Sequence, residues 1–148
     1  MKHTYAGLKD GRQGFSLVEL IVVVAIMAAL VAGIAPQYLK YVEKSRIAAD
    51  EATIREFCRS LHVGGVDTDY THIFGAGTIL LSRHDPPQFD PEDVTTTDYP
   101  RILYEHFGEE YLRIRLQSDK YGEYGVTVRV APVSTGGYTV TWERNESD

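Results

Sequence analysis

The stretch Gly14-Phe15-Ser16-Leu17-Val18-Glu19-Leu20 decides how this chain folds. It stands at the entrance of an apolar run, residues 20–35, that contains no charged and no polar side chain. An acidic side chain in the middle of a bilayer costs about 2.5–3.5 kcal/mol on insertion scales, and less near the interface. Glu19, at the edge of such a run, is therefore a functional candidate.

The residues before this stretch predict a targeting leader. Residues 1–14 are polar and mildly basic, with three basic residues and one acid, and they contain no apolar run that could pack. We therefore leave them out of the fold. An ordinary secretory signal would end in a small-residue cleavage site after the apolar run. Ala35 is poorly placed for such a site because Pro36 would follow the cut directly, and the segment 31–33 is a weaker candidate still.

A short basic leader, a small residue, a carboxylate and an apolar run, in this order, resemble the processing site of type IV pilins and pseudopilins. The resemblance covers residues 1 to about 60 and includes Pro36, where the family often carries a helix-kinking proline. It implies that the prepilin peptidase, a membrane-embedded aspartic peptidase, cuts after Gly14. It also implies N-methylation of the new N-terminus, Phe15. Gly14 leaves the scissile bond sterically open because it has no Cβ.

The same resemblance implies a role for Glu19 in assembly. The cut leaves the apolar run on the mature protein and creates a cationic α-amine on Phe15, about 6 Å from Glu19 along a helix axis. In the family, the carboxylate of an incoming subunit pairs with the amine of one already in the filament. An unpaired charge at low dielectric is expensive, so this pair would fix the axial register. Burial of residues 17–34 against identical helices would supply the bulk attraction. The alternative is a carboxylate favoured by the helix macrodipole.

The apolar run is borderline for a membrane span. It has sixteen residues, whereas a full span needs about twenty. Basic residues flank it on both sides, so charge asymmetry does not set its orientation. The resemblance implies a single-pass protein of the bacterial cytoplasmic membrane with a cytoplasmic leader. It would contact membrane lipid before assembly and later lie in an extracellular or cell-envelope filament.

We expect three parts along the chain. They are a leader at 1–14, a hydrophobic transmembrane and filament-core helix at 15–36, and a globular pilin-like head at 37–148. Pro36 lacks the donor for a regular helical turn, so a kink or a melted stretch is expected there.

Helical periodicity predicts an amphipathic helix over 37–62, because apolar residues recur mainly at spacings of three, four and seven. Gly64-Gly65 is expected to stop this helix. A variable loop region at 63–110 follows, in which residues 78–82 form either a short strand or a helix fragment.

A short helix is also expected inside this loop region. Asp98 is placed to start it, and Gly108 is placed to end it after Phe107. The proline-rich, acidic segment 85–93 is expected to be an exposed loop.

Strand periodicity predicts an antiparallel sheet at 111–144. Apolar and polar residues alternate around 112–116, 126–130 and 138–142, and residues 134–137 predict a turn. A lone sheet cannot bury its apolar face, so the amphipathic helix is its natural cover. The predicted fold class is α+β: a long N-terminal helix packed on a three-stranded antiparallel sheet, pilin-like in architecture.

The net charge and the cysteine content argue against two functional features. The chain carries a net charge of −6, which becomes −8 once the leader is removed, and this disfavours nucleic-acid binding by a uniformly basic surface. Cys58 is the single cysteine, so no intrachain disulfide forms. Many pilins of Gram-negative bacteria close a C-terminal loop with a disulfide. This chain cannot form such a disulfide, which puts in doubt the adhesive features that accompany the loop.

Metal sites are weakly indicated. Cys58 and His62 share a helix face at i and i+4, but no further ligand is positioned by the sequence. Asp90, Glu92 and Asp93 could supply oxygen ligands for calcium, as in the C-terminal loops of some pseudopilins. Their spacing is not that of an EF-hand, which favours a solvated acidic loop. We expect no cofactor, with calcium as the weak alternative.

The leading functional hypothesis is a structural subunit of a type IV pilus or pseudopilus. Its expected partners are the prepilin peptidase, identical or related pilin subunits, and an inner-membrane assembly platform. Glu19 favours a major subunit, because some initiating tip subunits lack this carboxylate. The alternative is a minor pilin that acts as a binding module for DNA uptake or a surface ligand. No nucleophile–base or metal arrangement supports an enzyme. A pilus, a secretion pseudopilus and a competence fibre all remain open.

Overall fold

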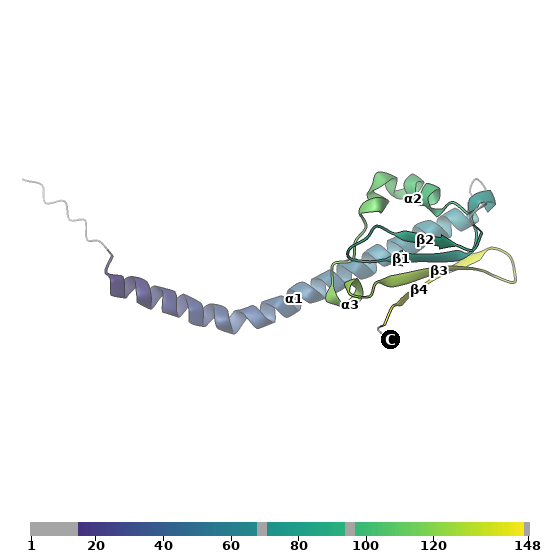
Figure 1. Ribbon diagram of the computed structural model, residues 1–148. Helices are drawn as coiled ribbons and strands as arrows, with labels where there is room; N and C mark the ends of the chain where they lie inside the picture. Colours follow the sequence, from purple (N-terminus) through teal and green to yellow (C-terminus); the bar gives the residue numbers. More distant parts are fainter. Residues whose placement is uncertain (1–14, 68–70, 94–96, 147–148) are drawn as a thin grey trace, which may run out of the picture. The chain divides into compact units, whose positions relative to one another are not determined.

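The computed structural model describes residues 15–67, 71–93 and 97–146. Its elements, labelled in Figure 1, are α1 (Leu17–Val66), η1 (Thr71–Ile73), β1 (Gly77–Leu81), β2 (Gln88–Pro91), α2 (Tyr99–Phe107), η2 (Gly108–Arg113), α3 (Asp119–Gly122), β3 (Val126–Pro132) and β4 (Tyr138–Arg144). The chain divides into two compact units between Leu39 and Lys40. We call residues 15–39 the stem and residues 40–146 the globular unit.

Helix α1 remains helical through Pro36, which lies inside it. The alternative of a melted stretch at this proline is therefore wrong. Proline removes one N–H donor but does not by itself stop the flanking residues from making their own helical hydrogen bonds. The kink at Pro36 stays a prediction.

The predicted end of α1 at Gly64-Gly65 is also wrong, because the helix continues to Val66. A Cβ on Gly64 would lie 2.4 Å from Cγ2 of Ile102, and one on Gly65 would lie 2.8 Å from the ring of Phe74. These glycines therefore serve the close packing of α2 and of Phe74 against the helix rather than termination.

The sheet has four antiparallel strands in the order β2-β1-β3-β4. The α+β class with a long N-terminal helix is confirmed, but the predicted strand count of three is wrong. Residues 78–82, left open between strand and helix, supply most of β1, a central strand. Strand β2 lies inside the segment 85–93, which we expected to be a loop. It is a four-residue edge strand that ends in Pro91. Proline cannot donate a hydrogen bond to a neighbouring strand, so it is tolerated in edge strands.

The strand predicted at 112–116 is wrong. Residues 108–113 form the 3₁₀ helix η2 instead, with Tyr111 buried and Leu112 48% exposed. The backbone N–H of Leu116 then donates to the carbonyl of Ser82. The alternation of apolar residues in this segment therefore does not correspond to one buried strand face.

Two local predictions are confirmed. Asp98 caps α2 by accepting a hydrogen bond from the backbone N–H of Arg101 at 3.1 Å, and Gly108 ends the helix with a positive φ of 60°. Residues 134–137 form the turn between β3 and β4, where Gly136 and Gly137 adopt φ values of 93° and 85°. Both glycines occupy the left-handed region that residues with a Cβ disfavour.

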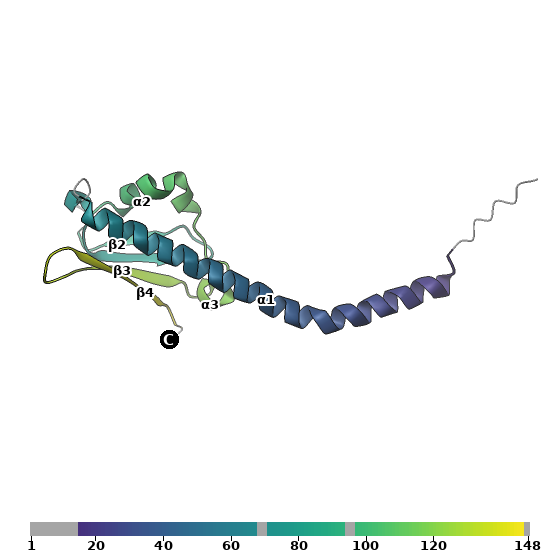
Figure 2. The same cartoon turned by 180° about the vertical axis from the view of Figure 1, so that it is seen from behind.

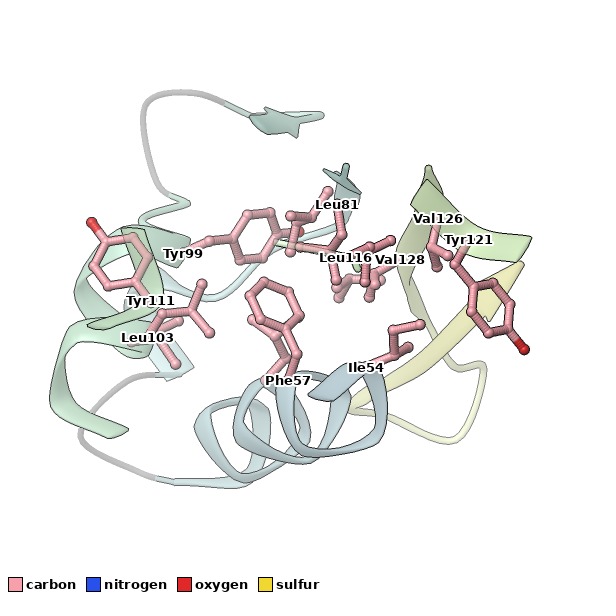
Figure 3. Close-up of a cluster of buried hydrophobic side chains, with 14 of the residues drawn as sticks. Ile54, Phe57, Leu81, Tyr99, Leu103, Tyr111, Leu116, Tyr121, Val126 and Val128 are labelled. Atoms are coloured by element: carbon pink, nitrogen blue, oxygen red, sulfur yellow. The ribbon is translucent and has the colours of Figure 1, made fainter. Parts of the chain in front are cut away.

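The core lies between α1 and the sheet, as predicted. Figure 2 shows the second half of α1 running across the sheet, and Figure 3 shows Ile54 and Phe57 pointing from the helix toward the strands. Both side chains are fully buried, as is Leu61 one turn further on. Full burial of such a side chain contributes about 1.5–3 kcal/mol. Strands β1 and β3 present the opposing apolar face, formed by Ile79, Leu81, Val126, Val128 and Val130.

Candidate functional site: the N-terminal end of the stem

The stem begins with a capping box. The hydroxyl of Ser16 accepts a hydrogen bond from the backbone N–H of Val18 at 3.3 Å. In return, Oε2 of Glu19 accepts one from the backbone N–H of Ser16, also at 3.3 Å. These reciprocal bonds satisfy two donors that a helix start otherwise leaves without partners. The Ser-x-x-Glu spacing of this motif is visible in the sequence, but our sequence analysis did not use it.

The capping box leaves Glu19 able to bind a second partner. Its one hydrogen bond within the described residues uses Oε2, and a carboxylate offers about four acceptor positions. Phe15 stands just outside the helix with 83% of its surface exposed. Glu19 and the residue whose amine the cleavage would free are thus both at the surface. Gly14 lies outside the described residues.

The stem exposes an almost continuous apolar surface. Its large apolar side chains from Leu17 to Ile34 are between 47% and 72% exposed. An 18-residue window of α1 has a mean hydropathy of 2.8, and none of that window is buried. A core helix of a soluble protein would bury this surface against its own domain. The stem is therefore apolar enough to enter a membrane or to pack against other chains.

A shallow apolar hollow of about 290 Å³ lies on the stem near Pro36. Its lining includes Ile34, Ala35 and Tyr38. The nearby Gly33 has open space where a Cβ would stand. This hollow is a depression in the apolar surface, and a side chain of a neighbouring helix could fill it.

The predicted metal candidates do not gather into a cluster among the residues that the structure describes. No group of three or more His, Cys, Asp or Glu side chains comes together there to hold an ion. The calcium candidates Asp90, Glu92 and Asp93 do not form such a group. Cys58 and His62 likewise lack further ligands.

Cys58 is a partly buried thiol that packs against the core. Burial raises its pKa to about 11, because a thiolate is poorly solvated away from water. The thiolate is the reactive form, so this cysteine is an unreactive packing residue.

We expect Cys58 to alkylate slowly at neutral pH. Its thiolate fraction at pH 7 should be more than about a hundredfold below that of a free cysteine with pKa 8.5. Because the pKa is raised, reactivity should increase with pH up to about 11. The rate of iodoacetamide labelling of the native chain, compared with a cysteine peptide, measures this. Equal rates at pH 7 would contradict the burial argument.

A polar cluster missed by the sequence analysis joins α1 to the segment before α3. Asp50 is only 2% exposed. It accepts hydrogen bonds from the backbone N–H of Gln117 (2.8 Å) and from the backbone N–H (2.8 Å) and hydroxyl (2.5 Å) of Ser118. At the next residue of α1, the Tyr121 hydroxyl donates to Glu51 at 2.9 Å. This hydrogen bond, aided by the charge of Lys120, holds the pKa of Glu51 below its usual value.

Comparison with known proteins adds one decisive match. The family model of the prokaryotic N-terminal methylation motif matches residues 9–35. This motif is the leader signature of type IV pilins and pseudopilins. The chain therefore carries, over residues 9–35, a motif that type IV pilins and pseudopilins share. A search of the curated proteins and a search of the solved structures each found no match.

Most of the matched motif lies on the stem. It spans the last residues of the leader, the capping box and the apolar helix up to Ala35. The motif implies processing by a prepilin peptidase and assembly into pilus filaments. It indicates a structural protein of a family that is typically not enzymatic. Together with the long apolar helix, it is consistent with membrane anchoring.

Proposed function

We propose that this pilin-like protein is a structural subunit of a type IV pilus or pseudopilus filament. In this proposal the prepilin peptidase cuts between Gly14 and Phe15, and Phe15 becomes N-methylated. The observation that carries the proposal is the methylation motif on a helix whose apolar side chains are exposed. An apolar helix that keeps its place after maturation can serve first as a membrane anchor and then as a filament core.

Apolar burial supplies the driving force for this assembly. The large apolar side chains between Leu17 and Ile34 are 47–72% exposed. Packing the stem against identical stems would bury this surface at about 25 cal/mol per Å². Burial of this kind has no direction, so it does not by itself fix how far one helix slides along another.

In this proposal the carboxylate of Glu19 fixes the axial offset between neighbouring helices, which apolar burial leaves open. Oε1 of Glu19 is available to the Phe15 amine of a neighbouring subunit while Oε2 keeps its bond to Ser16. Inside an apolar helix bundle, a shift of one turn would leave both charges unpaired. Breaking a buried pair costs about 3–5 kcal/mol, so one axial offset is favoured over its neighbours.

The proposal also includes the partners that the subunit contacts before and during assembly. Before assembly the stem contacts membrane lipid in the bacterial cytoplasmic membrane, with the leader on the cytoplasmic side. An inner-membrane assembly platform then transfers the mature subunit to identical or related subunits. The globular unit ends up on the outside of the filament, in the cell envelope or beyond it.

The mature N-terminus gives the first test of this function. Intact-mass spectrometry of the protein from its native cells should show a chain that begins at Phe15 and carries one added methyl group. Cleavage at this bond retains the stem, whereas an ordinary signal peptidase would remove it. A product that begins after Ala32, Gly33 or Ala35 would contradict the proposal.

A further inference from the structure

Three arginines from different parts of the globular unit surround one open hollow. Arg46 comes from α1, Arg83 follows β1, and Arg115 lies between η2 and α3. The hollow measures about 400 Å³, and Leu116 and Gln117 complete its lining. Arginine side chains repel one another when they converge, so such a cluster costs free energy. The chain carries a net charge of −6, so the cluster does not simply reflect an excess of basic residues.

The fold fixes two of these guanidinium groups without cancelling the charge of the site. Arg115 donates to the backbone carbonyls of Leu112 (2.9 Å) and Ile114 (2.8 Å), and neither carbonyl carries a formal charge. Arg83 pairs with Asp119 at 2.9 Å. Arg46 has no hydrogen-bond or ion-pair partner in the described part of the chain. Two of the three positive charges therefore lack an acidic partner.

The carboxylates close to the hollow are already engaged. Asp50 accepts three donors from residues 117 and 118, and Glu43 accepts the backbone N–H of Asp119 at 2.7 Å. These four hydrogen bonds hold the segment that lines the hollow in place. They leave the exposed Arg46 and the half-buried Arg115 without a carboxylate partner, and a guanidinium is the planar fork that binds carboxylates in two-point fashion.

The opposite end of the sheet carries unpaired carboxylates. Asp90 lies in edge strand β2 and Glu92 directly follows it. Neither side chain forms an ion pair with a basic residue of the described chain. Because Gly77 pairs with Pro91 while Leu81 pairs with Val126, these acids lie at the start of β1, whereas Arg83 follows its end. Strand β1 itself is about 13 Å long from Gly77 to Leu81, so the acids and Arg83 lie near opposite ends of it.

We propose that the arginine hollow binds Asp90 and Glu92 of a second copy of this chain, so that globular units join end to end. This inference rests on the proposed function, because a filament holds its subunits in one orientation. When all globular units point the same way, one end of each unit lies next to the opposite end of the following unit. Such a heterologous contact repeats without closing and generates an open helical polymer. The ion pairs would add specificity to the apolar contacts of the stem.

A charge-swap experiment tests this contact in native cells that express the full chain. Arg46→Glu and Asp90→Lys should each lower the filament fraction of mature subunit about tenfold, because each places like charges opposite one another. The two substitutions combined should restore most of the filament. The measurement is the ratio of subunit in sedimented filaments to mature subunit in the membrane.

Two features make the test specific to the contact. Arg59→Glu makes the same charge change on the same helix away from the hollow, and it should leave the filament fraction unchanged. A local folding defect from Arg46→Glu could not be repaired by a charge at the other end of the sheet, so only an intermolecular contact predicts rescue.

The outcomes separate this inference from the proposed function. Wild-type filaments with no rescue in the double variant would overturn the contact and leave the filament role intact. A wild-type chain that is never trimmed at Phe15 would instead overturn the filament role. Normal filaments in Arg46→Glu that bind less double-stranded DNA than the wild type would assign the hollow to nucleic-acid phosphates and overturn the inference.

Discussion

Replacing Glu19 by Gln should leave cleavage after Gly14 intact and abolish filaments. Glutamine supports a capping box as glutamate does, so the bond to Ser16 and the start of α1 should survive. The negative charge is lost, and the Phe15 amine of the neighbouring subunit would be buried without a partner. That penalty is about 3–5 kcal/mol, or more than about a hundredfold in assembly. Electron microscopy and sedimentation of sheared filaments measure the effect.

Two further variants separate the cap from the charge. Glu19→Ala removes both and should also be trimmed but fail to assemble. Ser16→Ala removes the hydroxyl that caps Val18 and keeps the charge, so it should lower helix stability by about 1 kcal/mol and still form filaments. If Glu19→Gln made filaments in wild-type amounts, the carboxylate would be only a helix cap, and the register would have another origin.

The sequence was sufficient to predict the stem because its signal is long and one-dimensional. Sixteen residues without a polar side chain fix a helix in almost any apolar environment, and the order of leader, Gly14 and Glu19 predicts a cleavage site. None of these features depends on contacts with distant residues. The capping box at Ser16 was equally local, and recognising the Ser-x-x-Glu spacing would have been enough to predict it.

The sheet was harder to predict because its strands depend on partners far away in the sequence. Residues 78–82 form an apolar run too short for its periodicity to distinguish a strand from a helix fragment. They become a central strand because β3, nearly fifty residues later, pairs with them. The segment 112–116 shows the opposite case, where an alternating pattern did not form a strand. There Tyr111 turns inward, and Leu112 remains 48% exposed.

The polar contacts of the globular unit could not be read from the sequence. In the sequence, Asp50 is one of several charged residues of the predicted amphipathic helix 37–62, and nothing local marks it as buried. In the structure it is buried, because the segment after η2 folds over it and presents three hydrogen-bond donors. The arginine hollow has the same origin, since its three side chains come from separate segments.

Replacing Asp50 by Ala should produce the largest loss of stability among the polar residues of the globular unit. It would leave the backbone N–H groups of Gln117 and Ser118, and the hydroxyl of Ser118, without their acceptor in a buried site. Each unsatisfied group costs about 1–3 kcal/mol, so we expect a loss of about 3–5 kcal/mol. Urea unfolding of the mature chain in detergent can be followed by the fluorescence of Trp142, the single tryptophan. Its ring lies 5.9 Å from that of Tyr121, close to the affected segment.

Glu43→Ala is the matched control for this prediction. Glu43 is also a carboxylate of α1 and also accepts a backbone N–H, that of Asp119, but the bond is exposed. Water can replace its carboxylate, so the loss should be below about 1 kcal/mol. Asp50→Asn keeps the shape and one acceptor oxygen and should fall between the two. If Asp50→Ala unfolded at the same urea concentration as Glu43→Ala, water would have to reach the donors of Gln117 and Ser118. The hydrogen bonds of Asp50 would then not be what holds this segment, and with it the arginine hollow, against α1.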